Sequence, residues 1–186
     1  FMVSGPAATA LLQHTTSNNI AALAIGDAQY AYMPNTNGGV VDDLLVYRLG
    51  EEKYMLVVNA SKLAKDWDWR TAQNKGFGAT LENKSDAYAL LAVQGPKAHA
   101  LMKRLSAVDT ATQKSFTVVE TTVAAAAHVY VATTGYTGAG GVERYVPVAH
   151  ATTVLDALLT DGAALASHPA GLARRGTVLR AVGDRH

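Results

Sequence analysis

Two adjacent aspartates, Asp42 and Asp43, stand in the middle of a segment that otherwise has the composition of a β-strand. Residues 40–47 have the sequence Val-Val-Asp-Asp-Leu-Leu-Val-Tyr and follow an Asn-Gly-Gly turn at 37–39. Aspartate is uncommon in strands, and a buried carboxylate needs hydrogen-bond partners. The pair is therefore a candidate for binding or orienting a polar ligand, with an edge strand carrying two solvated acids as the alternative.

The alternation of side chains along a strand separates these two carboxylates. Asp42 points to one face, and the other face carries Val41, Asp43, Leu45 and Tyr47. We therefore expect one carboxylate to face into the protein and the other to face solvent.

A glycine-rich loop at residues 134–141 gives the second indication of a ligand site. The loop has no Gly-Lys-Ser/Thr of a phosphate-binding loop, and a strand follows it where a dinucleotide fingerprint needs a helix. It contains Tyr136, and Glu143 begins the next strand. A carboxylate accepts two parallel N–H bonds, so Glu143 suits a ring with an amino group beside a ring N–H, as in a pterin. A plain hairpin loop followed by a solvated glutamate is the alternative.

Other catalytic chemistries find little support in the residue types. The chain has no cysteine, which excludes disulfides and thiolate chemistry. None of the six histidines has the spacing of a metal-ligand pair, so we expect no metal site. Arg174 and Arg175 precede an apolar segment, where they could hold an anion or cap a helix face.

Composition indicates a globular protein with a substantial core. The chain has 186 residues, of which 49% are hydrophobic and 17% are charged. Its net charge of +1 gives no indication of a nucleic-acid or membrane-surface partner, and no apolar run reaches the roughly 18 residues of a membrane-spanning helix.

Local patterns predict an α+β fold in which hairpins alternate with strand–helix units. Strands are expected at residues 1–3, 29–33, 40–49, 54–59, 79–82, 88–94, 115–120, 125–133 and 142–148. Helices are expected at 62–73, capped by Ser61, and at 96–105, 152–159 and 173–182.

An internal similarity suggests two related halves. Residues 3–12 and 93–102 each show a strand that ends at Gly, a Pro at the expected first helical position, and an Ala/Leu-rich helix. We expect a first half at residues 1–90 and a second at 91–186, which could also pack as one continuous unit. Chance similarity of a common local motif is the alternative.

An ordered set of motifs resembles aminomethyltransferase, the T-protein of the glycine cleavage system, over nearly the whole chain. The motifs are Asn37-Gly38-Gly39-Val40-Val41-Asp42-Asp43-Leu44, Val57-Val58-Asn59-Ala60, Leu90-Leu91-Ala92-Val93-Gln94-Gly95-Pro96, Thr134-Gly135-Tyr136-Thr137-Gly138 and Pro169-Ala170-Gly171-Leu172. The resemblance implies a central fragment of that enzyme, without its N-terminal segment and its C-terminal barrel domain.

The resemblance also implies a folate-binding fold with mixed or antiparallel sheets, flanking helices and a central cavity. The family reaction transfers the methylene carbon from the aminomethyl-lipoyl arm of the H-protein to tetrahydrofolate, with release of ammonia. Tetrahydrofolate is then a co-substrate and the lipoylated H-protein a partner. The compartment would be the mitochondrial matrix in a eukaryote and the cytoplasm in a bacterium.

The family's functional residues map onto named positions of this chain. The resemblance makes Asp43 the catalytic aspartate and Glu143 the glutamate that binds the pterin. It makes Asn59, Tyr136 and Arg175 further folate-site residues. Tyr47, on the face predicted for Asp43, completes the predicted folate-binding set.

Two segments depart from the family pattern and leave alternatives open. The loop has Ala139-Gly140-Gly141 where the family has Glu-Asp-Gly, and residues 174–182 lack the family's Asp and Glu. A catalytically inactive relative that acts as a scaffold or structural subunit is one alternative. The folate domain of a larger sarcosine- or dimethylglycine-oxidising enzyme is another. The iron–sulfur assembly relatives carry a cysteine motif that this chain lacks.

Overall fold

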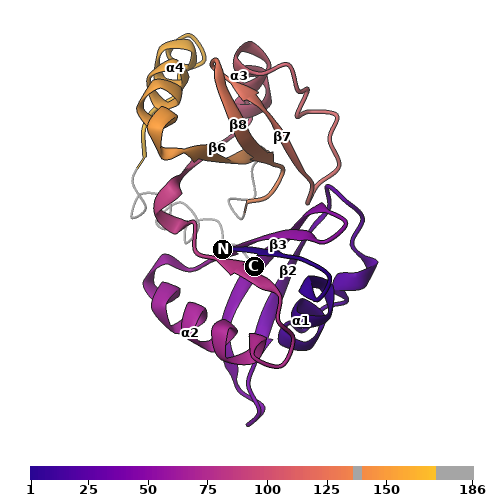
Figure 1. Cartoon of the computed structure of the whole chain (residues 1–186). Helices are drawn as coiled ribbons and strands as arrows, with labels where there is room; N and C mark the ends of the chain where they lie inside the picture. Colours follow the sequence, from indigo (N-terminus) through magenta and orange to yellow (C-terminus); the bar gives the residue numbers. More distant parts are fainter. Residues whose placement is uncertain (136–139, 171–186) are drawn as a thin grey trace, which may run out of the picture. The chain divides into compact units, whose positions relative to one another are not determined.

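The computed structural model describes residues 1–135 and 140–170, which form two compact units. Unit 1 comprises Phe1–Ala87 and Phe116–Val119, and unit 2 comprises Tyr88–Ser115 and Glu120–His186 (Figure 1). The helix predicted at 173–182 lies outside the described residues.

A five-stranded sheet organises unit 1, with the strand order β2-β3-β4-β1-β5. Every pair of neighbouring strands in this sheet is antiparallel. The strands are β1 (Met2–Ser4), β2 (Ala28–Pro34), β3 (Val40–Gly50), β4 (Lys53–Val58) and β5 (Thr80–Glu82). Strand β3 lies between β2 and β4, and Asp42 and Asp43 pair only with β2, because the pairing of β3 with β4 begins at Leu44.

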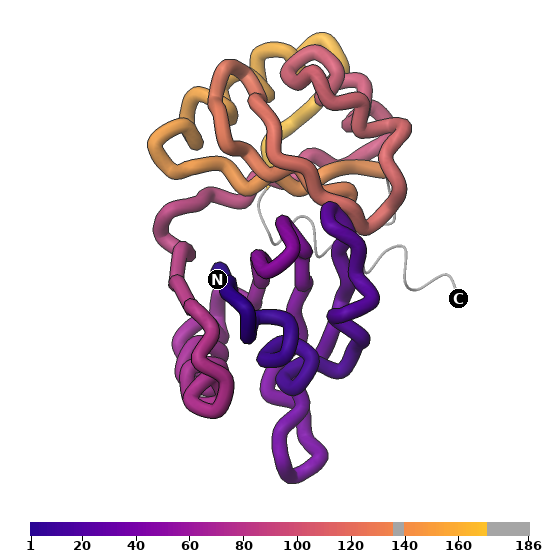
Figure 2. The backbone as a smooth tube through the Cα atoms, turned by 45° about the vertical axis from the view of Figure 1, so that its right-hand side comes forward, coloured from indigo at the N-terminus to yellow at the C-terminus, as the bar shows by residue number. Residues whose placement is uncertain are grey.

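The hairpin between β2 and β3 projects from the sheet, as the trace in Figure 2 shows. Asn35 Oδ1 accepts hydrogen bonds from the amides of Asn37 and Gly39, each at 2.9 Å. Gly38 has a φ of +77°, a conformation that side-chain-bearing residues rarely adopt. These contacts fix the turn and thereby the register that places β2 beside the two aspartates.

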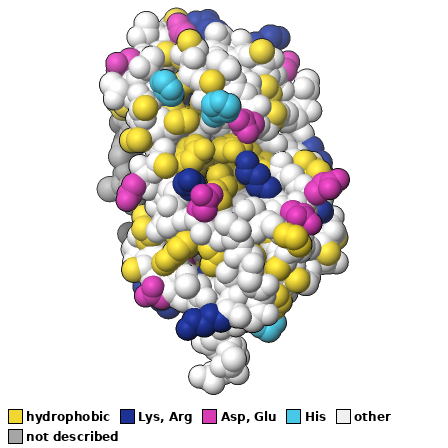
Figure 3. Space-filling model, viewed as in Figure 1, with side chains coloured by type: hydrophobic (Ala, Val, Ile, Leu, Met, Phe, Trp, Pro, Cys, Tyr) yellow, Lys and Arg dark blue, Asp and Glu magenta, His cyan; other side chains and the backbone are white. Residues whose placement is uncertain are grey.

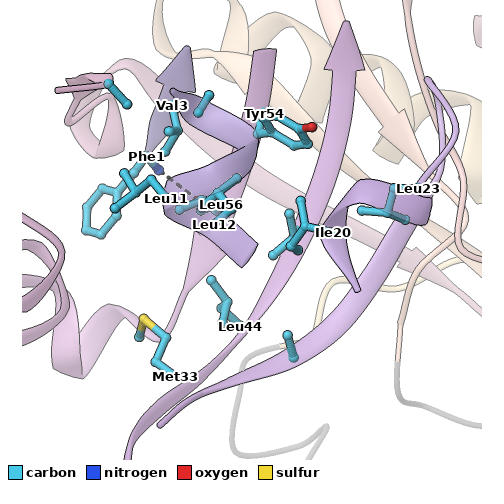
Figure 4. Close-up of a cluster of buried hydrophobic side chains, with 14 of the residues drawn as sticks. Phe1, Val3, Leu11, Leu12, Ile20, Leu23, Met33, Leu44, Tyr54 and Leu56 are labelled. Atoms are coloured by element: carbon cyan, nitrogen blue, oxygen red, sulfur yellow. Dashed lines mark hydrogen bonds between the residues drawn. The ribbon is translucent and has the colours of Figure 1, made fainter. Parts of the chain in front are cut away.

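Helices α1 (Ala8–Thr15) and α2 (Leu63–Asn74) cover one face of this sheet. The apolar core between them is shown in Figure 4, where Leu11 and Leu12 of α1 lie near Leu44 and Leu56 of the sheet. Trp67 of α2 packs against this core. Short 3₁₀ helices at Ile20–Ala22, Ala60–Lys62 and Ser85–Ala87 complete the unit.

Unit 2 contains a four-stranded sheet with the order β6-β9-β8-β7 and two helices. Helices α3 and α4 contact each other and strand β9. The strands are β6 (Tyr88–Gln94), β7 (Val118–Val123), β8 (Ala126–Ala132) and β9 (Gly141–Pro147). The helices are α3 (Ala98–Leu105) and α4 (Ala151–Ala163), with a 3₁₀ turn at Val148–His150.

The two units repeat one topology, which confirms the two related halves. The chain order is β1-α1-β2-β3-β4-α2 in unit 1 and β6-α3-β7-β8-β9-α4 in unit 2. The sheet order β2-β3-β4-β1 corresponds to β7-β8-β9-β6. The buried apolar residues of α1 and α3 also correspond: Ala8, Leu11 and Leu12 in one, Ala98, Leu101 and Met102 in the other.

The glycine that ends the first strand of each repeat has the same role. Gly5 and Gly95 have φ values of +95° and +126°. Their amides donate to the carbonyls of Glu52, at 3.0 Å, and Gly140, at 2.8 Å. A positive φ at the strand-to-helix turn explains why the sequence similarity includes Gly at this position.

Several predicted details differ from the structure. Ser61 lies within the 3₁₀ turn before α2 and makes no capping hydrogen bond, since Lys62 is the N-cap residue. Pro6 and Pro96 each stand two residues before their helix, one position outside the N-cap. Strand β7 begins three residues later than expected, and residues 116–118 just before and at its start pair with residues 26–28 in unit 1.

Candidate active site

Asp43 on β3 is half-buried, and its carboxylate accepts hydrogen bonds from two side chains. The Tyr30 hydroxyl donates to Oδ2 at 2.7 Å, and Asn59 Nδ2 donates to Oδ1 at 2.8 Å. Both bonds stabilise the charged form, so the pKa of Asp43 lies below its ordinary value, with the Tyr30 bond as the largest cause. The same bond raises the pKa of Tyr30. The site thus holds an anionic carboxylate in a fixed orientation at neutral pH.

The register of β2 against β3 explains the Tyr30–Asp43 contact. Tyr32 lies directly opposite Asp43, and Tyr30 lies opposite Leu45. Residues on a diagonal of an antiparallel pair share a face and are within reach of long side chains. Tyr30 therefore approaches Asp43 from the neighbouring strand, on the face opposite to Ala31, which is buried in the core.

Two exposed aromatic rings accompany the carboxylate on this face. Tyr30 and Tyr32 are 42% and 47% exposed, and their rings meet edge to face with centroids 5.3 Å apart. Aromatic rings beside a few oriented polar groups form the kind of surface that binds a flat heterocycle.

The predicted alternation along β3 is wrong at its start. Val41 belongs to the core cluster together with Leu44 and Val46, because the register against β2 shifts between Met33 and Pro34. A bulge of this kind moves the residue on one side of it to the other face.

The two carboxylates lie on opposite faces of β3, as expected, because Asp42 is paired with the buried Met33 and Asp43 with the exposed Tyr32. Asp42 and Asp43 are both half-buried, and Asp42 Oδ2 is buried without a hydrogen-bond partner among the described residues. The two side chains differ in their partners, since Asp43 has the Tyr30 hydroxyl and Asp42 does not.

Asn59 joins the two aspartates. It follows the last residue of β4 and precedes the 3₁₀ turn, and its Nδ2 donates to Asp42 Oδ1 at 3.1 Å as well as to Asp43 Oδ1. An amide nitrogen carries two hydrogens, so one Asn can serve both acceptors. The structure thus brings Asn59 to Asp43, as the predicted site requires.

Glu143 lies in unit 2, on β9, and is 7% exposed. The Thr134 hydroxyl donates to Glu143 Oε2 at 2.6 Å. This burial excludes the alternative of a solvated glutamate, and burial of an acid beside a short donor is typical of a binding group. The convergence of Asp43 and Glu143 on one folate stays a prediction.

Of the three remaining predicted folate-site residues, the structure describes one, Tyr47. Tyr47 is fully buried on β3, and its assignment to the folate site stays a prediction. Tyr136 and Arg175 lie outside the described residues, so their assignment stays a prediction.

The sequence reasoning missed three residues of this region. Tyr30 and Tyr32 follow a Tyr-Ala-Tyr alternation in β2 that could have identified them once the hairpin was recognised. Asp66 of α2 is fully buried near Asp42, and its sequence context gives no signal of this.

The described parts of the chain offer no metal-binding cluster and no membrane-spanning helix. Within residues 1–135 and 140–170, His, Asp and Glu side chains do not gather in groups of three that could hold an ion. None of the helices described there is long and apolar enough to cross a bilayer. On the face seen in Figure 3, acidic and basic side chains are interspersed, in agreement with the small net charge.

Comparison with known families identifies the domain. Residues 1–181 match the family model of the GCVT N-terminal domain. The chain belongs to this family. As a GCVT domain it is similar to the aminomethyltransferases of Porphyromonas gingivalis and Bacteroides fragilis, each 47% identical over 178 residues. The match covers 96% of the chain and 49% of each relative, so the chain spans about half the length of these curated relatives.

Solved structures confirm the fold of this GCVT domain. The glycine cleavage system aminomethyltransferase T from Bartonella henselae superposes with a TM-score of 0.76 and 30% identity, over 87% of this chain and 43% of that one. The heterotetrameric sarcosine oxidase from Corynebacterium sp. U-96 superposes with a TM-score of 0.66 over 91% of this chain and 82% of its own. Its 15% identity supports the fold alone. The predicted α+β folate-binding fold and the resemblance to aminomethyltransferase are thereby confirmed.

Proposed function

We propose that this chain is the folate-binding part of an aminomethyltransferase of the glycine cleavage system. The observation that carries the proposal is the Asp43 carboxylate, held ionised by Tyr30 and Asn59 on a face with exposed aromatic rings. The similarity to aminomethyltransferases over 96% of the chain supports the same assignment.

The reaction joins tetrahydrofolate to the aminomethyl group that the lipoyl arm of the H-protein carries. Two bonds from the methylene carbon form, to folate N5 and N10, and its bonds to sulfur and to the amino nitrogen break. The two protons lost from the folate nitrogens leave on the lipoyl thiol and on ammonia, so the reaction needs no oxidant or reductant.

Asp43 acts in this reaction as a fixed negative charge. Attack by a folate nitrogen on the methylene carbon places positive charge on that nitrogen, and a preoriented carboxylate stabilises it. The lowered pKa of Asp43 keeps the group ionised at neutral pH. The remaining acceleration comes from positioning of the two bound partners.

Glu143 is proposed to bind the pterin edge of the folate. Its Oε2 already accepts from Thr134, and a carboxylate has acceptor sites for further N–H donors. Because the named relatives are bacterial, we place the reaction in a bacterial cytoplasm rather than in a mitochondrial matrix.

The test is methylene transfer by the full-length protein with aminomethylated H-protein as donor. Asp43→Asn should abolish formation of methylene-tetrahydrofolate and keep tetrahydrofolate affinity within about tenfold, because the change removes charge but little volume. Asp86→Asn, at an exposed position of the same unit, is the matched control and should keep full activity. Turnover of the Asp43 variant at the native rate would refute the assignment, and so would absence of tetrahydrofolate binding by the native protein.

A further inference from the structure

The Thr134 side chain is buried against the Glu143 carboxylate. Thr134 follows the end of β8 and is 3% exposed, and its hydroxyl donates to Glu143 Oε2 at 2.6 Å. This length is typical of a charge-assisted O–H···O⁻ bond, which is roughly twice as strong as a bond between neutral groups. Glu143 Oε1 accepts no hydrogen bond from the described residues, so its acceptor sites remain for a ligand.

The register of β8 against β9 explains why Thr134 reaches this carboxylate. Ala132 lies opposite Glu143, and Thr134 follows two residues later. Side chains two residues apart along an extended chain point to the same face, and a diagonal neighbour lies within reach of a long side chain. Thr134 therefore approaches Glu143 from the adjacent chain, just beyond the end of β8.

The backbone that leads into Glu143 is held closely against β6. A Cβ atom at Gly141 would lie 2.5 Å from the carbonyl oxygen of Val93, which leaves no space for a side chain there. The Gly95 amide donates to the carbonyl of Gly140 at 2.8 Å. The position of the Glu143 backbone is thus fixed, and the freedom that remains is rotation about the bonds of its side chain. The Thr134 hydroxyl restricts this rotation.

We propose that Thr134 is a positioning residue for tetrahydrofolate, which fixes the orientation of the Glu143 carboxylate before the pterin binds. This inference rests on the proposed role of Glu143. A pterin edge offers two parallel N–H groups, and a carboxylate accepts both only in one orientation. A carboxylate that is already oriented loses less conformational entropy when the ligand binds. The effect of Thr134 therefore belongs to tetrahydrofolate affinity and not to the rate of transfer.

The experiment measures tetrahydrofolate titration and methylene transfer with the full-length protein. Thr134→Val removes the hydroxyl, keeps the side-chain shape, and should raise the Kd for tetrahydrofolate by about tenfold, a typical cost of losing a hydrogen bond to a charged group. At saturating tetrahydrofolate, kcat should stay within about threefold of the native value, because the pterin edge keeps the same contacts during the transfer. Thr134→Ser keeps a donor and should restore the Kd to within about threefold.

Thr110→Val is the matched control for the loss of a buried threonine hydroxyl. Thr110 lies in the same unit, is 2% exposed, and its hydroxyl is hydrogen-bonded to His99 Nδ1 at 2.9 Å. Both Val variants lose one buried hydrogen bond, so both should lower the melting temperature. Only Thr134→Val should raise the Kd for tetrahydrofolate. Thr134→Ala removes the same hydroxyl by a smaller side chain and should give the same increase in Kd.

A double-mutant cycle with Glu143→Ala tests whether Thr134 acts through the carboxylate. In the Glu143→Ala background, Thr134→Val should raise the Kd by less than about twofold further, because no carboxylate is left to orient. Native Kd for Thr134→Val and Thr134→Ala would overturn the inference. Equal increases in both backgrounds, or an equal increase for Thr110→Val, would overturn it as well.

Glu143→Ala alone keeps this result distinct from the proposed function. If Glu143→Ala weakens tetrahydrofolate binding while Thr134→Val binds as tightly as the native protein, only the positioning role fails. If Glu143→Ala binds with native affinity, the proposed pterin contact fails and the Thr134 inference fails with it. Absence of tetrahydrofolate binding by the native protein would refute the proposed function itself.

Discussion

Replacement of Asp66 by Asn should make this protein more stable at neutral pH. The folded state raises the pKa of Asp66 from its ordinary 3.8 to about 6. Between these two values the folded chain binds a proton more tightly than the unfolded chain. The free energy of unfolding therefore falls as pH rises through this window, and the whole cost is present at pH 7.

The size of the effect follows from the same interval. At 1.36 kcal/mol for each pH unit, a pKa change from 3.8 to about 6 corresponds to at most about 3 kcal/mol. The pKa of about 6 already includes the electrostatic effects of Asp42, Lys65 and Arg70. Because Asn does not ionise, we expect Asp66→Asn to gain about 1–3 kcal/mol at pH 7 and nothing near pH 3.5.

Urea unfolding followed by tryptophan fluorescence measures this change in the free energy of unfolding. The chain has two tryptophans, Trp67 and Trp69, and both lie on α2 with Asp66, so the signal reports on the unit that contains the change. Asp68→Asn, exposed on the same helix, should stay within about 0.5 kcal/mol of the native protein at every pH. If Asp66→Asn raised the free energy of unfolding equally at pH 4 and pH 7, or lowered it at pH 7, the pKa of Asp66 would not be raised by folding.

Two further predictions concern unit 2. Glu143→Ala should weaken tetrahydrofolate binding by about 1–3 kcal/mol, the cost of a lost charged hydrogen bond, and calorimetric titration with unchanged affinity would mean that Glu143 does not contact the folate. Ala125→Gly should stabilise the protein by about 0.5–1 kcal/mol, because Ala124 and Ala125 form the β7–β8 turn with φ values of +48° and +65° that favour Gly. In thermal unfolding, the control Ala127→Gly, within β8, should instead lose about 0.5–1 kcal/mol, and a loss for Ala125→Gly as well would contradict the strain argument.

Strand positions were predictable because the local composition of this chain agrees with its fold. The β-branched and aromatic run at 40–49 became β3, and the turn at 37–39 became the tip of its hairpin. The register of the strands was harder to predict, since it depends on the partner strand. The shift between Met33 and Pro34 moved Val41 into the core, and no feature of β3 alone indicates that shift.

The helix α2 shows where local pattern is misleading. Its sequence Leu-Ala-Lys-Asp-Trp-Asp-Trp-Arg places an acid and a base four residues apart, a spacing typical of a solvated helix face. In the structure, Asp66 and Arg70 are the buried residues of this helix. Their burial depends on Asp42, Thr15 and Met33, which come from distant parts of the chain.

The internal repeat gives an independent reason to regard Glu143 as functional. In unit 1, Met55 of β4 lies opposite Met2 of β1 and Tyr47 of β3. In unit 2, Glu143 of β9 lies opposite Ala92 of β6 and Ala132 of β8.

Since β4 corresponds to β9, one repeat has a buried thioether where the other has a buried carboxylate. An apolar residue at this position is therefore compatible with the fold. Burying an acid there brings a desolvation cost that a methionine does not have. Its paired neighbours Ala92 and Ala132 are also smaller than Met2 and Tyr47, the corresponding residues of the other repeat. An acid in this position agrees with the proposed role of Glu143 in binding the folate.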